Sequence, residues 1–97
     1  MSRRWIVRPL AESDLESATT WYEHQCADLG LRFLDAVDHV FERVRTPPLQ
    51  FPLVSGNLRR ALLHTIPYAV YFRITDDAVA VLAVLHLRRR PGTVQGR

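Results

Sequence analysis

Two mainly apolar runs, at residues 68–75 and 78–87, flank the dipeptide Asp76-Asp77. Both runs are rich in β-branched and aromatic residues, and a two-residue link between such runs predicts a β-hairpin. With this turn, Thr75 faces Ala78 across the hairpin. The pairs that follow are Arg73 with Ala80, Tyr71 with Leu82, and Ala69 with Val84.

This register divides the hairpin into an apolar face and a mixed face, because side chains alternate between the two faces of a strand. The apolar face is predicted to carry Tyr68, Val70, Phe72, Ile74, Val79, Val81, Ala83 and Leu85. The mixed face carries Ala69, Tyr71, Arg73, Leu82, Val84 and His86, and continues to Arg88. The apolar face requires a covering layer, and the mixed face is where a partner or substrate would bind. A one-residue error in the turn would exchange the two sets.

Two amphipathic segments upstream of the hairpin supply the covering layer. Residues 31–44 have apolar side chains at helical spacing and charged side chains opposite them, and this helix must end before Pro47-Pro48. An earlier helix ends at about residues 24–25. It starts near residue 11 or at Ser13, which forms a capping-box pattern with Glu16. Because only a few residues around Gly30 join the segments, we expect an antiparallel helical hairpin.

The remaining elements complete an α+β fold, in which a helical hairpin packs on one face of a mainly antiparallel sheet. Residues 4–8 are expected to form a first strand beside the last one, and residues 58–65 to form a strand after a proline-rich loop at residues 46–56. The expected order is strand, helix, helix and three strands. We expect residues 1–97 to be a single domain, irregular from Arg88 to Arg97, with about 91–97 as a flexible basic tail.

Charge and composition narrow the class of partner. All thirteen basic residues are arginines, and the net charge is +3. Arginine binds carboxylates and phosphates with paired hydrogen bonds, so an acidic protein or a nucleic acid would fit. Cys26 is the only cysteine, and the apolar run after the N-terminus is too short for a signal peptide or a membrane span, so we expect a cytoplasmic protein. The sequence has no metal-ligand spacing and no phosphate-binding loop, so we expect no metal and no cofactor.

Several short motifs resemble the ParE-like branch of the RelE/ParE toxin superfamily. Ala11-Glu12-Ser13-Asp14-Leu15, followed by Ala18 and Trp21-Tyr22, resembles the opening of the first helix, and Gly30-Leu31-Arg32-Phe33 resembles the start of the second. Pro48 with Phe51-Pro52 resembles the connecting loop. The three-strand signature of the superfamily resembles Arg59-Arg60-Ala61-Leu62, Pro67-Tyr68-Ala69-Val70-Tyr71, and residues 81–86 with Arg88-Arg89.

The resemblance implies a toxin of a bacterial type II toxin–antitoxin (plasmid stabilisation) system. It implies neutralisation by a cognate antitoxin with an acidic or amphipathic C-terminal segment, and action on DNA gyrase. We expect no membrane association and no sequence-specific DNA binding by this chain. The residues expected to contact partners are Arg59, Arg60, Tyr71, Arg73, His86, Arg88, Arg89 and Arg90.

An enzymatic alternative remains open, because RelE-like members of the superfamily cleave mRNA on the ribosome. The catalytic residues would then be His86, Arg88 and Tyr71, with His86 as the acid–base group. However, Ala69 occupies a position that holds an arginine in many RelE-like nucleases, which favours a ParE-like, non-enzymatic toxin. A third possibility is an inactive member that only binds antitoxin. Trp21 and Tyr22 are expected to pack between helix and sheet.

Overall fold

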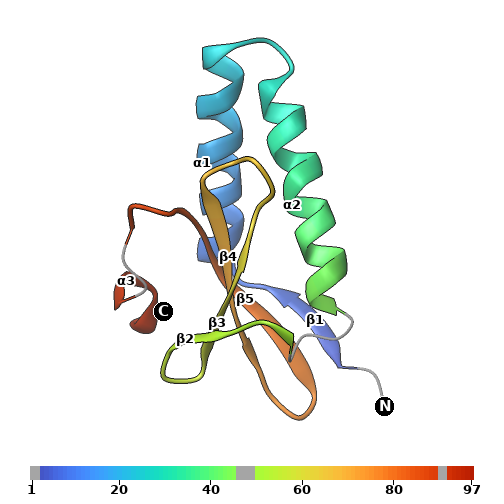
Figure 1. The fold of residues 1–97 in the computed structure, drawn as a ribbon, viewed down its shortest axis with the longest axis vertical. Coiled ribbons are helices and arrows are strands. Elements are labelled where there is room, and N and C mark those ends of the chain that lie inside the picture. Colours follow the sequence, from blue (N-terminus) through green and yellow to red (C-terminus); the bar gives the residue numbers. More distant parts are fainter. Residues whose placement is uncertain (1–2, 46–49, 90–91) are drawn as a thin grey trace.

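The computed structural model describes residues 3–45, 50–89 and 92–97, and it confirms the predicted α+β architecture (Figure 1). The elements are β1 (Arg4–Val7), α1 (Pro9–Gln25), α2 (Leu29–Arg45), β2 (Leu53–Ser55), β3 (Leu58–Leu62), β4 (Tyr68–Ile74), β5 (Ala78–His86) and α3 (Gly92–Gln95). The strands form one sheet in the order β1-β5-β4-β3-β2. β1 lies beside β5, as expected for the first strand, and runs parallel to it; every other neighbouring pair is antiparallel.

Helix α1 starts earlier than the capping-box pattern predicts. Pro9 occupies the first helical position, and Arg8 is an extended N-cap residue with no side-chain capping bond. Proline suits this position because its missing N–H would have no partner within the helix. Ser13 therefore lies inside α1 rather than at its start.

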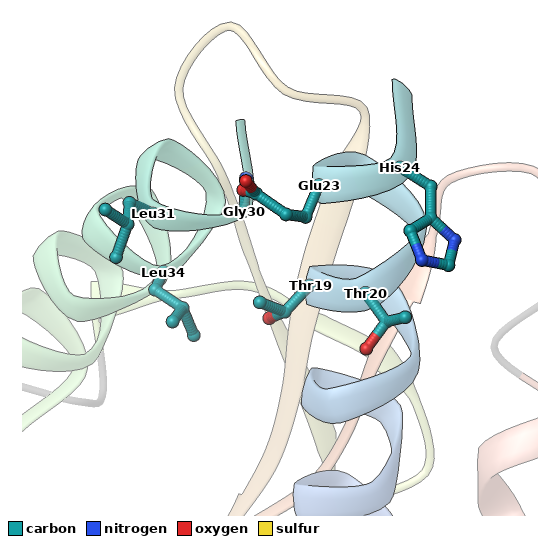
Figure 2. Close-up of a pocket in the computed structure, with 7 residues that line it drawn as sticks. All are labelled: Thr19, Thr20, Glu23, His24, Gly30, Leu31 and Leu34. Carbon is teal, nitrogen blue, oxygen red and sulfur yellow. The ribbon is translucent and has the colours of Figure 1, made fainter. Parts of the chain in front are cut away.

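The link between α1 and α2 is held by Glu23. Its Oε2 accepts a hydrogen bond from the backbone N–H of Asp28 at 3.1 Å, and its Oε1 accepts one from Gly30 at 3.0 Å. These bonds satisfy N–H groups that the start of a helix leaves without partners. Gly30 lies close to α1, since a Cβ there would be 3.0 Å from both Glu23 Oε1 and the Thr19 carbonyl oxygen. Figure 2 shows Glu23 reaching from α1 toward Gly30.

The helical hairpin covers one face of the sheet, as predicted. Phe72 and Val81 are fully buried in the core beneath the helices. Aromatic rings link the layers: Tyr22 stacks on Phe33 at 5.4 Å between centroids, and Phe33 meets Tyr68 edge-on at 5.1 Å. The helix-side core consists of Ala11, Ala18, Phe33, Val37, Val40, Phe41, Val44, Phe51, Ala61, Leu63, Val70, Phe72, Val79, Val81 and Val84.

A β-bulge in β5 changes the predicted register of the hairpin. Arg73 pairs with Ala80 as predicted, but the register then shifts, and Tyr71 pairs with Ala83 rather than Leu82. Ala69 correspondingly pairs with Leu85 rather than Val84. Because Leu82 is an extra residue in β5, every side chain beyond it changes face. Val84 joins the helix-side core, whereas Ala83 and Leu85 lie on the opposite face.

The face away from the helices holds a second apolar cluster rather than an open mixed surface. The cluster consists of Leu58, Ala69, Tyr71, Leu82, Ala83, Leu85 and Val94. Val94 belongs to α3 and is fully buried, so residues 92–95 form a packed helical turn where an irregular tail was predicted. Strand β2 was also not predicted, because its three residues lie within the expected loop. No helix in the described parts of the chain is long and apolar enough to cross a membrane.

Candidate binding groove

A groove of about 370 Å³ lies between α1 and the second half of β5. Its α1 side is formed by Asp14, Ser17, Ala18 and Trp21, and its sheet side by Tyr68, Val84, Leu85, His86 and Arg89. We call it the α1–β5 groove. The groove exists because β1 ends opposite Val81, which leaves the rest of this β5 edge without a neighbouring strand in the described structure.

The β5 bulge brings His86 into this groove. His86 pairs with Tyr68, and their rings meet edge-on with centroids 5.4 Å apart. Tyr68 packs against the helix-side core, so His86 lies on the helix side of the sheet, not on the predicted mixed face. The backbone N–H of Arg88 donates to His86 Nδ1 at 3.1 Å. The ring hydrogen of the neutral imidazole is therefore at Nε2.

Asp14, which lines the groove, forms an ion pair with Arg97 beside the bulge. Asp14 Oδ2 accepts hydrogen bonds from the Val84 backbone N–H at 3.1 Å and from the Arg97 guanidinium at 2.7 Å. The same guanidinium donates to the Leu82 carbonyl oxygen at 3.1 Å. Only 15% of the Asp14 side chain and 18% of the Arg97 side chain are exposed. The pair forms hydrogen bonds with the Val84 N–H and the Leu82 carbonyl oxygen, which the bulge leaves without strand partners, so its role is structural.

Trp21 stands at the rim of the groove, in contrast to the predicted packing role. It is 56% exposed, although its ring touches Tyr22 edge-on at 5.1 Å between centroids. Tyr22 is half-buried and packs against the core as predicted. Trp21 also borders a second hollow, which is lined by Glu16, Ser17, Thr20 and His24 as well.

The two tyrosines beside the groove are neutral at physiological pH. Burial raises the pKa of the Tyr68 phenol, and Asp14 adds to this effect while Arg89 opposes it. Burial also raises the pKa of Tyr22, with a smaller contribution from Tyr68. Both phenols therefore keep their O–H groups, which can donate as well as accept hydrogen bonds.

The arginines predicted to bind partners lie on different surfaces. Arg60 and Arg73 are half-buried on the face away from the helices, since they pair with Tyr71 and Ala80 of that face. Arg59 lies on the other face and donates to the Phe51 carbonyl oxygen at 2.6 Å. Arg88 and Arg89 are exposed just after β5, and only Arg89 lines the groove. Arg90 lies outside the described residues.

The structure does not bring together the alternative catalytic set of His86, Arg88 and Tyr71. His86 lies in the α1–β5 groove, whereas Tyr71 is 1% exposed within the second apolar cluster on the opposite face. The Tyr71 hydroxyl is buried and has no hydrogen-bond partner among the described residues. A substrate that contacts His86 in the groove would therefore not reach Tyr71.

A further hollow, of about 380 Å³, lies between α1 and α2 near their connection (Figure 2). Apart from Glu23 and Gly30, it is lined by Thr19, Thr20, His24, Leu31 and Leu34. Its only carboxylate, on Glu23, already accepts two backbone hydrogen bonds. In the described ranges, no three His, Cys, Asp or Glu side chains are grouped so that they could hold a metal ion.

Comparison with known proteins assigns the chain to a family. The sequence profile of the family described as "ParE toxin of type II toxin-antitoxin system, parDE" matches residues 6–91, which is most of the chain. The chain belongs to this ParE toxin family. Membership implies that the toxin has an antitoxin partner.

One curated relative supports the assignment, and one solved structure shares the fold. The toxin is 32% identical over 96 residues to Toxin ParE2 of Mycobacterium tuberculosis, with the same values for strains CDC 1551/Oshkosh and H37Rv. This alignment covers 98% of the present chain and 91% of ParE2. A solved structure entitled "Chromosomal ParDE TA system from P. aeruginosa" has the same fold, with a TM-score of 0.79 at 15% identity. The match covers 88% of this toxin and 96% of that chain.

Proposed function

We propose that this toxin acts in the cytoplasm by binding and inhibiting DNA gyrase, without catalysing a reaction, and that its cognate antitoxin neutralises it by covering its binding surfaces. The observation that carries the non-enzymatic part is the separation of His86 from Tyr71 on opposite faces of the sheet. General acid–base chemistry requires its groups within hydrogen-bonding reach of one substrate. The gyrase part rests on what is general for ParE toxins.

The surface of the toxin supports a protein partner. Six large apolar side chains are exposed in the described structure: Leu10, Trp21, Leu31, Leu53, Leu62 and Leu87. Exposed apolar groups and arginines together are typical of protein-binding surfaces, in which arginine and tryptophan contribute disproportionately to affinity. We propose Arg60, Arg73, Arg88 and Arg89 as the described arginines that contact the antitoxin or the target. An acidic, amphipathic antitoxin segment would complement both kinds of group.

One observation favours an enzymatic alternative. Tyr68, His86 and Arg89 line the same groove, and together they provide a phenol, an imidazole and a guanidinium. Such groups could bind a phosphate and move a proton in RNA cleavage. Ribosome-dependent mRNA cleavage is therefore the second candidate function, with this trio in place of the set that contained Tyr71.

A pair of assays with the purified toxin separates these functions. We expect the toxin to inhibit supercoiling by gyrase, to leave mRNA intact in a translation extract, and to lose its effect when the cognate antitoxin is added. Cleavage of mRNA that disappears in the His86→Ala variant would replace the proposal with the nuclease function. If the toxin affects neither assay but still binds its antitoxin, it is an inactive member of the family.

A further inference from the structure

Charge is divided unequally between the two layers of the toxin. Residues 9–45, which form α1, α2 and their link, contain eight acidic and three basic side chains, a charge of −5 with histidine neutral. The rest of the chain contains ten arginines and two aspartates, a charge of +8. Because the helices cover only one face of the sheet, a polyanion is attracted to the other face and repelled from the helical layer.

Arginines from three strands share the face away from the helices. Arg60 of β3 and Arg73 of β4 lie there and are half-buried. Arg4 of β1 lies on the same face and is exposed, because the next residue, Trp5, packs against the helix-side core and side chains alternate along a strand. We call Arg4, Arg60 and Arg73 the arginine surface. It extends over three strand spacings, about 14 Å, and duplex DNA presents about eight phosphates over that length.

Small side chains separate these arginines. On β5, Ala78 pairs with Arg4, and Ala80 pairs with Arg73. None of the described strand residues on this face is acidic. Asp77 lies in the hairpin turn, where its carboxylate accepts a hydrogen bond from the Thr75 hydroxyl at 3.0 Å. A row of phosphates can therefore pass over the alanines with guanidinium groups on both sides.

The arginine surface fits duplex DNA better than single-stranded RNA or a protein. Proteins that bind single strands stack the bases on exposed aromatic rings. Among the described residues of this face the only aromatic one is Tyr71, which is 1% exposed. The alanines of β5 give a protein partner no large apolar anchor. The backbone of a duplex requires neither feature, because its phosphates accept charge-assisted hydrogen bonds from guanidinium groups.

We propose that the arginine surface binds the phosphate backbone of duplex DNA without reading its sequence, so that the toxin contacts the DNA on which gyrase acts. The DNA binding rests on the arrangement of charges, whereas its use against gyrase rests on the proposed function. This assigns Arg60 and Arg73 to DNA and leaves Arg88 and Arg89 to protein partners. The acidic helical layer then faces away from the DNA and stays accessible to a protein.

The test measures binding of the purified toxin to a short labelled DNA duplex of mixed sequence by fluorescence anisotropy at several salt concentrations. The logarithm of the affinity should fall with the logarithm of the salt concentration with a slope of about −3, since each neutralised phosphate contributes about −0.9. Arg4→Gln and Arg60→Gln should each weaken binding about threefold or more, and each should make the slope shallower by about one unit.

The matched control keeps the net charge of the double variant Arg4→Gln/Arg60→Gln. It is Arg32→Gln/Arg43→Gln, which removes two exposed arginines from α2. Because salt screens charges that lie away from the bound DNA, this control should change the affinity by less than about twofold. Thermal melting of each variant confirms that it is folded.

Four outcomes would overturn the DNA binding. The first is no binding of the duplex at low salt, and the second is an equal loss of affinity in the test and control variants. Tighter binding of a single-stranded RNA of the same length would assign the arginine surface to RNA. Equal competition by polyglutamate would assign it to an acidic protein.

A supercoiling assay separates this inference from the proposed function. If the toxin binds the duplex but does not inhibit gyrase, the gyrase proposal fails and the DNA binding stands. If it inhibits gyrase without binding the duplex, only the DNA inference fails. If it does both, Arg4→Gln/Arg60→Gln should require about tenfold more toxin for half-inhibition, because two independent threefold losses multiply. Unchanged inhibition by this variant would overturn the use of DNA contact against gyrase.

Discussion

Removal of the Asp14 carboxylate should destabilise the toxin far more than removal of an exposed carboxylate. Asp14 bonds the Val84 N–H and the Arg97 guanidinium, and both charged side chains are more than four-fifths buried. A hydrogen bond to a charged group contributes about 1.5–3 kcal/mol, and breaking a buried ion pair costs about 3–5 kcal/mol. Because some exposure remains, we expect Asp14→Ala to lower the unfolding free energy by about 3 kcal/mol.

The control is the ion pair between Glu42 and Arg45 on α2, whose side chains are 73% and 45% exposed. An exposed pair three residues apart on a helix contributes roughly 0.5 kcal/mol or less, so Glu42→Ala should have little effect. Urea unfolding followed by circular dichroism gives both values.

A double-mutant cycle with Asp14→Ala and Arg97→Ala isolates the interaction between the two side chains. We expect a coupling energy of about 1–2 kcal/mol, because the stability changes caused by substitutions within one hydrogen-bond network do not add. Additive effects, or an Asp14→Ala cost as small as that of Glu42→Ala, would refute the view that this pair stabilises the bulge.

Three other results are expected from the same structure. Gly30→Ala should cost about 1–3 kcal/mol in urea unfolding, because its Cβ would be 3.0 Å from atoms of α1, whereas Gly92→Ala meets nothing within 4 Å and should be near neutral. Stability should fall as the pH rises above about 10, the pKa of tyrosine in the unfolded chain, because burial raises the pKa of Tyr68 in the folded state. In melting curves at alkaline pH, Tyr68→Phe should reduce this loss of stability. Val94→Ala should lower the unfolding free energy by about 2 kcal/mol, since it removes fully buried methyl groups, and an unchanged melting temperature would contradict the packing of α3.

The layers of the fold are predictable from sequence because periodicity and chain-breaking residues mark them. The helix that contains Phe33, Val37 and Val44 has most of its apolar residues on one side, so its buried face is predictable. The hairpin turn is set by Asp76-Asp77, and the pairing of Arg73 with Ala80 beside it is correct. The helix α1 starts two residues before the earlier predicted start, at Pro9, a residue that suits a first helical position.

The register beyond Leu82 could not be predicted because β5 carries no alternating pattern there. Residues 78–85 are all apolar, so a one-residue slip leaves both faces of the strand equally hydrophobic. The sequence is therefore equally compatible with the regular register and the bulged register. That slip moves His86 from the predicted mixed face into the α1–β5 groove. The bulge thus decides which residues form the candidate site.

One signal in the sequence does point to a polar contact between α1 and the rest of the protein. Asp14 lies on the same side of α1 as the buried residues Ala11 and Ala18, at spacings of three and four. A carboxylate in such a position requires a partner within the protein. The partners, Val84 and Arg97, are distant in sequence, so only the fold identifies them.

The candidate groove and the separation of the alternative catalytic residues both depend on the position of His86. Nuclear Overhauser contacts between the aromatic protons of the labelled toxin measure it directly. The edge-on packing of His86 on Tyr68 predicts strong cross-peaks between these two rings and none between His86 and Tyr71. Absence of the cross-peaks to Tyr68, with cross-peaks from His86 to the methyl group of Ala69 instead, would show that β5 runs without the bulge and would contradict the account.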